Sequence, residues 1–209
     1  MKNNEKPGGI ILLGGKSKRM GTDKYLLPFF NVTLIERLVA ELEKTVQEVI
    51  LITNEPEKLS FLPHKKYPDH YAISSALTGL HSGLNNSAYR INFVLACDLP
   101  LFDAHLIPCF QNHLSKSLIA IPQTDRGYEA LCGLYSKECL PEIETMFHEK
   151  NYAIHDLYRR VNTTVIPVQS LEALAHPHVF FNMNTPEDYS RALQLAKDTI
   201  KKADPPGSA

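Results

Sequence analysis

The stretch Leu12–Lys24, with the sequence LLGGKSKRMGTDK, decides the fold of this chain. It begins at the end of a short apolar run, Ile10–Leu13, which predicts a buried strand. The thirteen residues contain three glycines and four cations. In a parallel α/β sheet, ligands bind beyond the carboxyl ends of the strands. We therefore expect the loop after this strand to bind an anionic ligand, and a nucleotide fits its chemistry.

Predicted strands and helices alternate along the rest of the chain. Thr33 and Glu36 have the spacing of a capping box, and the apolar residues after Thr33 recur at helical spacing. The alternation predicts an α/β fold, a Rossmann-like three-layer α/β/α sandwich with a mostly parallel central sheet. The predicted strands are 10–13, 49–53, 92–97, 117–121, 131–135 and 163–168. The predicted helices begin at 34, 74, 141, 152 and 185.

Length and composition indicate one globular domain. The chain has 209 residues, 44% of them hydrophobic, which allows a sizeable core without disulfides or structural metal ions. We expect a single domain over 1–202 and a disordered tail over 203–209, which is rich in proline, glycine and serine. The net charge of −1 gives no indication of nucleic acid or a membrane surface as the main partner.

The cysteines and the N-terminus indicate a cytoplasmic enzyme. No two of the four cysteines have the two-residue gap of a zinc site or a redox motif, so we expect reduced core residues. The first apolar run is too short for a signal peptide or a membrane span. The cysteines are Cys97, Cys109, Cys132 and Cys139.

The residue types after the first strand suit a phosphate ligand. Gly14 and Gly15 have no side chains, so their backbone N–H groups can approach a phosphate or a base edge closely. Ser17 adds a hydroxyl, Arg19 can pair bidentately with phosphate oxygens, and Lys24 supplies a compact charge. A basic loop without function is the alternative, and the concentration of these residues at a strand end argues against it.

The spacing excludes two common phosphate-binding motifs. A P-loop requires lysine directly after its second glycine, whereas Gly21 is followed by Thr22. The dinucleotide fingerprint G-x-G-x-x-G requires glycine two residues after the first, whereas Gly14 and Gly15 are followed by Lys16. The loop therefore matches neither motif, and a nucleotide would have to be bound by a motif of another kind.

The same stretch closely resembles the signature L-x-G-G-x-S-x-R-M-G-x-D-K of the molybdenum cofactor guanylyltransferase (MobA) family. This family belongs to the nucleotidyltransferases with a glycosyltransferase-A-like Rossmann fold, the nucleotide-diphospho-sugar transferase type. Further segments resemble family segments in the same order, so the resemblance spans roughly residues 8 to 195. They are DHYAISSALTGLHSGL at 69–84, FVLACDLP at 93–100, YEALCGLY at 128–135 and FFNMNTPEDY at 180–189.

Two positions depart from the family pattern. Ser75 and Ala76 stand where the family usually has Gly-Pro, and Ala130 stands where proline is common. The first departure lies in the turn that the resemblance assigns to the base. Because serine still supplies a backbone N–H, we expect nucleotide binding to be retained.

The resemblance implies a specific reaction. Family members transfer GMP from GTP to molybdenum-loaded molybdopterin, which gives molybdopterin guanine dinucleotide and pyrophosphate. A phosphate oxygen of the acceptor attacks the α-phosphorus of GTP, and no covalent enzyme intermediate is required. Because both reactants are anions, the enzyme must screen their charge and align them.

The resemblance also implies the residues of the GTP site. Asp98, at the carboxyl end of an apolar strand, is expected to hold Mg²⁺ against the phosphates, with a turn cap before Pro100 as the alternative. Arg19 and Lys24 would stabilise the charge that develops on the phosphates, so all three are expected catalytic residues. Asp69 would bind guanine, with a surface turn as the alternative. The full set expected to bind GTP is Leu13, Gly14, Gly15, Ser17, Gly21, Lys24, Asp69 and Asp98.

The closing motif implies the second substrate site. Asn182 and Asn184 alternate along an extended segment, and their amides can both donate and accept hydrogen bonds. By resemblance they bind molybdopterin, and turn or cap duty before Thr185 is the alternative. Glu129 is a weaker candidate on the same side.

Two rival functions remain open at this stage. A related nucleotidyltransferase would use CTP, or would act on a sugar or alcohol phosphate, although Gly14 favours GTP because cytidylyl relatives usually carry Ala-Gly there. A nucleotide-binding regulator without catalysis is the other, and the intact Arg19, Lys24 and Asp98 argue against it. We expect a monomer whose further partners are proteins that deliver or receive the molybdenum cofactor.

Overall fold

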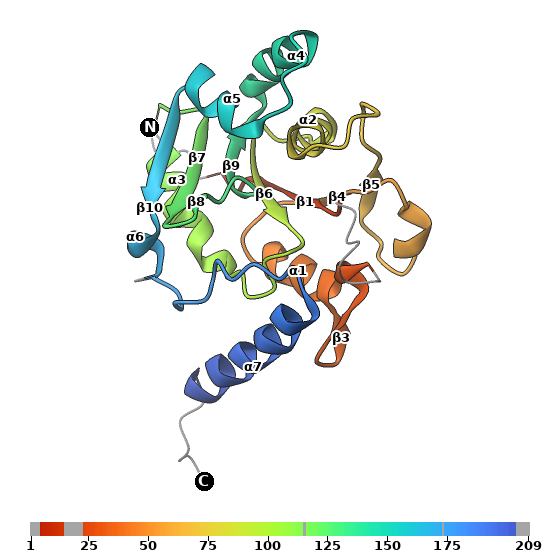
Figure 1. The fold of residues 1–209 in the computed structure, drawn as a ribbon, viewed down its shortest axis with the longest axis vertical. Helices are drawn as coiled ribbons and strands as arrows, with labels where there is room; N and C mark the ends of the chain where they lie inside the picture. Colours follow the sequence, from red (N-terminus) through yellow and green to blue (C-terminus); the bar gives the residue numbers. More distant parts are fainter. Residues whose placement is uncertain (1–4, 15–22, 115, 173, 204–209) are drawn as a thin grey trace.

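The computed structural model describes residues 5–14, 23–114, 116–172 and 174–203, and Figure 1 shows the arrangement of their helices and strands. The strands are β1 (Gly8–Leu12), β2 (Pro28–Phe29), β3 (Val32–Thr33), β4 (Val49–Ile52), β5 (Lys65–Tyr67), β6 (Ile91–Ala96), β7 (Ile119–Thr124), β8 (Gly127–Tyr128), β9 (Cys132–Ser136) and β10 (Thr163–Pro167). The helices are α1 (Leu34–Glu43), α2 (Ala76–Asn86), α3 (Ile107–Leu114), α4 (Leu140–His148), α5 (Ile154–Arg160), α6 (Val168–Glu172) and α7 (Pro186–Ala203). Short 3-10 helices are η1 (Lys24–Leu26), η2 (Pro56–Leu59), η3 (Ala104–Leu106) and η4 (Lys137–Cys139).

The central sheet has the strand order β10-β7-β9-β6-β1-β4-β5, and β8 pairs with β7. Neighbouring strands are parallel except at β9, which runs antiparallel to both β6 and β7, and at β8. At the centre of the sheet, Ile10 of β1 lies in register with Val94 of β6 and Ile50 of β4. The predicted mostly parallel sheet is therefore confirmed.

Helices cover both faces of this sheet. Because successive side chains of a strand point to opposite faces, Ile10 and Leu12 pack in the core formed with α2, α4 and α5, whereas Ile11 packs in the core formed with α1 and α3. In Figure 1, α2, α4 and α5 lie above the sheet and α1 lies below it. The predicted three-layer α/β/α sandwich is confirmed.

The predicted capping box starts α1. The Glu36 backbone N–H donates to Thr33 Oγ1 (3.3 Å), and the Thr33 backbone N–H donates to Glu36 Oε2 (2.7 Å). These two bonds satisfy donors that a helix N-terminus otherwise leaves unpaired. Leu34, Ile35 and Leu38 then point into the core and are fully buried.

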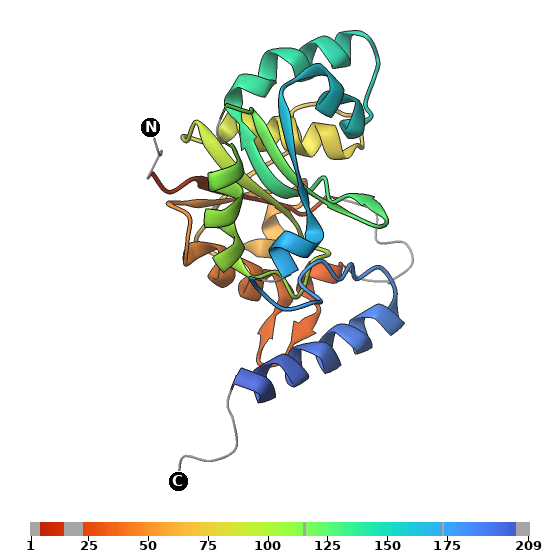
Figure 2. The ribbon, with the colours of Figure 1, turned by 90° about the vertical axis from the view of Figure 1, so that its left-hand side faces the viewer.

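The start of α7 is fixed by its own first turn. Asp188 Oδ2 accepts the backbone N–H groups of Asn184 and Thr185, both at 2.9 Å. The Tyr189 hydroxyl donates to the Pro28 carbonyl oxygen, which joins α7 to β2, and Figure 2 shows α7 beside the β2–β3 hairpin. The helix includes Ala203, where the sequence predicts a disordered tail to begin, because alanine favours continuation of the helix. The rest of that predicted tail, 204–209, lies outside the described residues.

Several short elements escape the sequence analysis. β5 has only three residues and lies at the sheet edge, and its sequence, Lys65–Tyr67, has no apolar alternation to reveal it. β2 and β3 have two residues each, and α3 carries Pro108, which masks its helical pattern. Helix ends otherwise differ from the predicted ends by one or two residues, which is the usual uncertainty of such boundaries.

Three of the four cysteines are buried core residues, as predicted, whereas Cys109 is half-buried. All four are free thiols, and Cys97, Cys132 and Cys139 are buried. Within the described residues, no helix is long and apolar enough to cross a membrane.

Candidate active site

The residues predicted to bind ligands lie where the parallel strands of the sheet end. We call this row of strand ends the active edge, as distinct from the outermost strands of the sheet. β1, β4, β5, β6 and β7 run parallel, so their carboxyl ends share this edge, and the antiparallel β9 begins there. The backbone connects neighbours at the edge. The Leu13 N–H donates to the Ile52 carbonyl oxygen (2.9 Å), and the Ala96 N–H donates to the Leu131 carbonyl oxygen (2.7 Å). The edge therefore brings together polar residues that follow several strands.

Lys24 makes contacts that unite three parts of the chain. Its Nζ donates to the Met183 carbonyl oxygen (3.0 Å) and to Asn184 Oδ1 (2.9 Å), and it lies 3.9 Å from Asp98 Oδ2. Only 13% of the Lys24 side chain is exposed. Three residues predicted separately from the sequence therefore meet at one point beyond the end of β6.

Asp98 lies two residues beyond the end of β6, at this edge. Its carbonyl oxygen accepts the Met183 N–H (2.8 Å), and 28% of its side chain is exposed. Burial raises the pKa of the Asp98 carboxyl above its ordinary value, and Lys24 and a backbone hydrogen bond oppose that rise. Because burial disfavours the ionised form of this carboxyl, a bound cation would stabilise that form.

The two asparagines of the closing motif point to different partners. Met183 between them is fully buried, so the alternation of an extended segment turns both amides away from the core. Asn184 accepts from Lys24 through Oδ1 (2.9 Å), whereas Asn182 Nδ2 lies 3.3 and 3.4 Å from the carboxylate oxygens of Glu129. The segment thus spans the edge from the Lys24 side to the loop before β9.

Glu129 forms the far side of this arrangement. Burial raises the pKa of its carboxyl, and the negative charge of Asp98 raises it further, while Asn182 and Arg126 oppose the rise. Arg126 itself donates through Nη2 to the Phe180 carbonyl oxygen (3.3 Å) and ties this loop to the segment before Asn182.

Asp69 lies at the opposite end of the edge, after β5, and pairs with a residue that the sequence analysis missed. Asn54 Nδ2 donates to Asp69 Oδ2 (2.9 Å), and the Asp69 N–H donates to Asn54 Oδ1 (2.9 Å). Asn54 comes two residues after β4, and the rule that singled out Asp98, a polar residue just beyond a buried strand, would have found it. A Cβ on Gly79 would stand 3.3 Å from Leu12 Cδ1 and 3.9 Å from Asp69 Oδ1, so α2 packs closely against the end of β1 at this position.

The glycine-rich loop is described only at its two ends. The Leu13 side chain is buried and its N–H donates to the Ile52 carbonyl oxygen, so the backbone group that it can offer to a ligand is its carbonyl oxygen. Among the described residues, no atom lies within 4 Å of where a Cβ on Gly14 would stand, so nothing in the described fold explains a glycine there. The predicted ligands Gly15, Ser17, Arg19 and Gly21 lie outside the described residues.

Comparison with known proteins bears on this geometry. The sequence profile of the MobA-like NTP transferase domain matches residues 9–165, which include all of β1 except Gly8, together with β6 and the loop before β9. The chain belongs to this family. The resemblance seen in the sequence motifs is confirmed, and the chain is a nucleotidyltransferase.

Similar proteins match the MobA-like chain over most of its length. A probable molybdenum cofactor guanylyltransferase of Pelotomaculum thermopropionicum is 31% identical over 91% of this chain and 94% of its own. Another, from Carboxydothermus hydrogenoformans, is 31% identical over 88% of this chain and 94% of its own. The crystal structure of molybdopterin-guanine dinucleotide biosynthesis protein A from Archaeoglobus fulgidus matches the fold with a TM-score of 0.81 and 22% identity, covering 91% of this chain and 99% of that one.

The departure of this MobA-like chain at Ser75 has a structural reason. Ser75 is the N-cap of α2, and its Oγ accepts the Thr78 backbone N–H (3.1 Å). The usual Gly-Pro would place proline at the position of Ala76, the first residue of α2, where proline is also well tolerated. The chain therefore starts the same helix by a side-chain cap instead.

Asp23 of the MobA-like signature acts beside Lys24 through another cation. It pairs with Lys58 Nζ at 2.8 Å, and Lys58 also pairs with Glu55 at 2.6 Å. Its backbone carbonyl oxygen accepts the Leu26 N–H (3.0 Å) within η1. Asp23 thus fixes the turn that carries Lys24. Because Asp23 pairs with Lys58, the Lys24 ammonium is directed to Met183, Asn184 and Asp98 instead.

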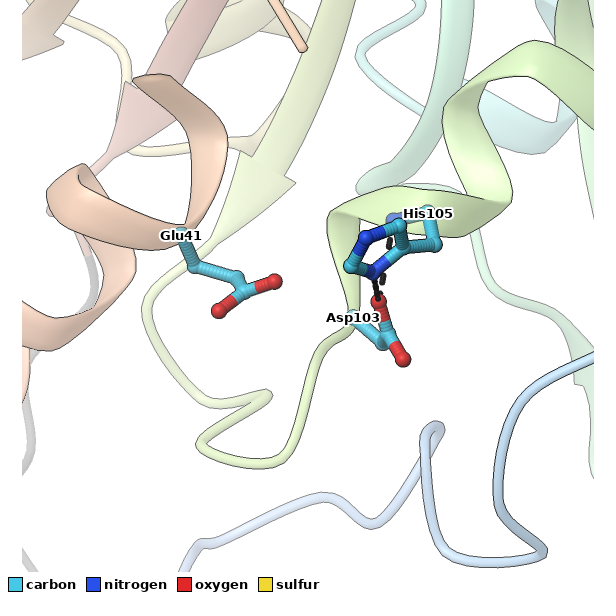
Figure 3. A group of neighbouring side chains, drawn as sticks. All are labelled: Glu41, Asp103 and His105. Atoms are coloured by element: carbon cyan, nitrogen blue, oxygen red, sulfur yellow. Dashed lines mark hydrogen bonds and ion pairs between the residues drawn. The ribbon is translucent and has the colours of Figure 1, made fainter. Parts of the chain in front are cut away.

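A group of acidic and imidazole side chains lies below the sheet. Among the described residues, Glu41, Asp103 and His105 place their ligand atoms within 4.8 Å of one another, and Figure 3 shows Glu41 of α1 facing the η3 turn that carries the other two. These residue types could hold a divalent cation. Their carboxylates also have partners of their own. Glu41 accepts the Ala104 N–H (3.0 Å), and Asp103 accepts the His105 N–H (2.9 Å), so the group also acts as the cap of η3.

Proposed function

We propose that this chain transfers GMP from GTP to molybdenum-loaded molybdopterin, forms molybdopterin guanine dinucleotide and releases pyrophosphate. The observation that carries the proposal is the convergence of Lys24, Asp98 and Asn184 beyond β6. These residues come from three separate motifs of the family signature. Relatives at 31% identity that bear the name guanylyltransferase support the choice of reaction.

GTP is proposed to lie along the edge from β5 to β6. Asp69, held by Asn54, accepts N–H donors of guanine, and the backbone of Leu13, Gly14 and Gly15 faces base and ribose. No atom of the described residues lies within 4 Å of where a Cβ on Gly14 would stand, which supports a close approach of the ligand to its backbone. The triphosphate then meets the cations and the turn of the glycine-rich loop, namely Ser17, Arg19, Gly21 and Lys24.

The reaction is a displacement at the α-phosphorus of GTP. An oxygen of the molybdopterin phosphate forms a bond to the α-phosphorus, and the bond from that phosphorus to the oxygen bridging to the β-phosphate breaks, so pyrophosphate leaves with the bonding electron pair. Lys24 and Arg19 stabilise the negative charge that builds on the phosphate oxygens. To reach them, the Lys24 ammonium exchanges Asn184 for a phosphate oxygen, which is the stronger, charge-assisted acceptor.

Asp98 fits a magnesium ion. Magnesium in such sites is held by one or two carboxylates together with substrate phosphates. Asp98 is the carboxylate nearest Lys24, and burial raises its pKa, so a cation would favour its ionised form. When bound, the ion supplies charge neutralisation at the phosphates.

Molybdopterin is proposed to lie on the other side of Asp98, against the segment Asn182–Asn184. Among the described residues no donor is bonded to Asn182 Oδ1, and its Nδ2 faces Glu129. Asn184 becomes available when Lys24 moves to the phosphates. Both amides then face the acceptor substrate from one short segment anchored by Met183.

The proposal is tested by following the α-phosphate. Purified protein is incubated with Mg²⁺, molybdenum-loaded molybdopterin and GTP labelled at the α-phosphorus, and the products are separated. We expect the label in a molybdopterin guanine dinucleotide and unlabelled pyrophosphate as the leaving group. Label that remains in GTP, with folded protein and intact acceptor, would contradict the proposed function. Glu138→Gln, at the opposite edge of the sheet, serves as the control variant and should transfer label normally.

A further inference from the structure

Glu129 occupies a defined position at the active edge. It lies between β8 and β9, and the Leu131 carbonyl oxygen beside it accepts the Ala96 N–H at the end of β6 (2.7 Å). Its backbone is held on both sides, because the Glu129 N–H donates to the Pro122 carbonyl oxygen (3.0 Å) and its own carbonyl oxygen accepts the Cys132 N–H (3.1 Å). The carboxylate is therefore presented by a rigid part of the sheet.

The described side chains that offer hydrogen-bond donors to this carboxylate are Asn182 and Thr124. The contacts of its oxygens with Asn182 Nδ2 are long, at 3.3 and 3.4 Å. Within the described residues, Glu129 forms no ion pair, and Arg126 of the same loop donates to the Phe180 carbonyl oxygen instead. A half-buried carboxylate can accept about four hydrogen bonds through its two oxygens. Glu129 thus retains acceptor capacity on the side where molybdopterin is proposed to bind.

The same combination of side chains occurs at the other end of the edge. There the carboxylate of Asp69 pairs with the carboxamide of Asn54 (2.9 Å), as Glu129 pairs with Asn182. Strand order places Asp98 between the two pairs: β7 and β9 lie to one side of β6, and β1, β4 and β5 lie to the other. At about 4.8 Å between strands, β5 is about 14 Å from β6, and β7 is about 10 Å from β6 on the other side.

The heterocycles of the two proposed substrates carry the same set of hydrogen-bond donors. Guanine and a pterin both carry the 2-amino-4-oxopyrimidine unit, in which a ring N–H and an exocyclic amine donate side by side. Two carboxylate oxygens match such a pair of donors, as they match the fork of an arginine. One carboxylate for each heterocycle would allow both substrates to be recognised through the same pair of donors.

We propose that Glu129 is a specificity-determining residue that binds the 2-amino-4-oxopyrimidine edge of the pterin, with Asn182 orienting its carboxylate. This rests on the proposed function, in which the second substrate is a pterin phosphate. The chain then reads the same edge twice, through Asp69 in the nucleotide and through Glu129 in the acceptor. Asp98 stands between the two sites, where the phosphates meet.

The experiment compares two small probes, pterin and lumazine, by titration against the full-length protein. Lumazine has a carbonyl oxygen where pterin has the 2-amino group, so it offers an acceptor in place of a donor. The wild type should bind pterin about tenfold or more tightly than lumazine. Glu129→Gln should abolish or reverse that preference, because its amide offers one acceptor and one donor. Glu129→Asp, which keeps the charge, should retain the sign of the preference with weaker binding.

Controls separate this inference from the proposed function. Glu138→Gln removes a carboxylate that pairs with exposed Arg90, and it should leave the preference intact. Stabilisation by GTP with Mg²⁺ is measured on the same variants, and Glu129→Gln should retain it. Equal binding of pterin and lumazine by the wild type, or an unchanged preference in Glu129→Gln, would overturn the role of Glu129 even where guanylyl transfer is observed. If Glu129→Gln lost affinity equally for pterin and lumazine, the role of Glu129 would be only to hold Asn182 in place. That result would also overturn the inference.

Discussion

Lys24 joins three parts of the chain that are far apart in sequence: its own turn, the end of β6 and the segment before α7. Its ammonium reaches Asn184 Oδ1 at 2.9 Å and the Met183 carbonyl oxygen at 3.0 Å, although 159 or more residues separate them. The side chain is almost enclosed, so removing its charge leaves these acceptors without a donor. Lys24 therefore orders these three segments in the structure, and its contact with a phosphate is part of the proposed function.

Replacing the Lys24 ammonium should weaken nucleotide binding. Lys24→Met keeps the length of the side chain and removes its charge, and we expect the affinity for GTP to fall about tenfold or more. Isothermal titration with GTP and Mg²⁺ measures this. The matched control is Lys65→Met, at the start of β5, whose ammonium pairs with Glu48 at the surface and should not affect GTP. Equal affinities of Lys24→Met and Lys65→Met would refute the role of Lys24.

Asp98 should show opposite effects on turnover and on stability. Asp98→Asn removes the carboxylate that would hold the cation, so Mg²⁺-dependent turnover should fall at least about 100-fold. Burial raises the pKa of Asp98 in the folded state, so ionisation of this group opposes folding. That cost is absent below the ordinary aspartate pKa of about 4 and appears as the pH rises through the raised pKa.

Asp98→Asn should therefore be more stable than the wild type at neutral pH in the absence of metal and nucleotide. The difference in Tm should narrow as the pH is lowered toward about 4, where the wild-type carboxyl takes up its proton. Thermal unfolding of both proteins over a pH series checks the sign. A variant that unfolds at lower temperature at neutral pH, or that turns over normally, would disprove the assignment.

At the scale of helices and strands, the close packing of α2 on β1 determines where the residues of the active edge lie. A Cβ on Gly83 would stand 2.6 Å from Ile10 Cγ2, in the middle of β1, whereas a Cβ on Gly79 would stand 3.3 Å from Leu12 Cδ1. Both glycines let the helix approach the strand, and the approach is closest at Gly83. The loop that carries Asp69 joins β5 to this helix, so the distance between α2 and β1 fixes the position of the side that is proposed to bind the base.

The two glycines should therefore respond differently to the same substitution. Gly83→Ala forces Ile10 or the helix to move and should lower the free energy of unfolding by about 1–3 kcal/mol. Gly79→Ala meets only the flexible end of Leu12, and the gain in helix propensity of about 1 kcal/mol should offset most of the cost. Urea unfolding of both variants measures the difference. Similar stabilities for the two variants would show that the close contact at Gly83 can relax.

Local patterns predict some of these elements well and others not at all. The apolar runs of β1, β4 and β6 and the capping box of α1 are visible in the sequence because each is set by neighbouring residues. The antiparallel insertion of β9 between β6 and β7, and the short edge strand β5, depend on pairing partners that local periodicity does not contain. Asp98 and Lys24 are recognisable from motifs, whereas the pair Asn54–Asp69 exists only once β4 and β5 lie side by side. The roles of Arg19 and the other loop residues stay predictions.

At the scale of the whole molecule, the edge carries two pairs of polar residues, one on either side of Asp98, and the proposed function assigns one substrate to each. The order of the strands within the sheet, rather than their order along the chain, decides which polar residues become neighbours. A nucleotide bound across β1, β4 and β5 would connect elements that are otherwise joined only through the sheet. Binding should then be visible in the stability of the entire fold.

GTP with Mg²⁺ should raise the thermal stability of the chain, and CTP should raise it less. A ligand at 100 times its Kd adds about 2.7 kcal/mol to the free energy of unfolding. Removing Mg²⁺ with a chelator should abolish most of the shift, because the triphosphate then meets the Asp98 carboxylate without a cation between them. Equal shifts with GTP and CTP, or a shift that is independent of Mg²⁺, would contradict the assignment of base or of metal.

The most direct test of guanylyl transfer is pyrophosphate release by the purified protein with Mg²⁺ and molybdenum-loaded molybdopterin, with GTP, CTP and ATP compared in parallel. The account predicts release with GTP alone, in amounts equal to the molybdopterin guanine dinucleotide formed, and none when the acceptor is left out. Release with CTP in place of GTP would contradict the assignment of the base, and no release with any of the three would contradict the proposed reaction itself.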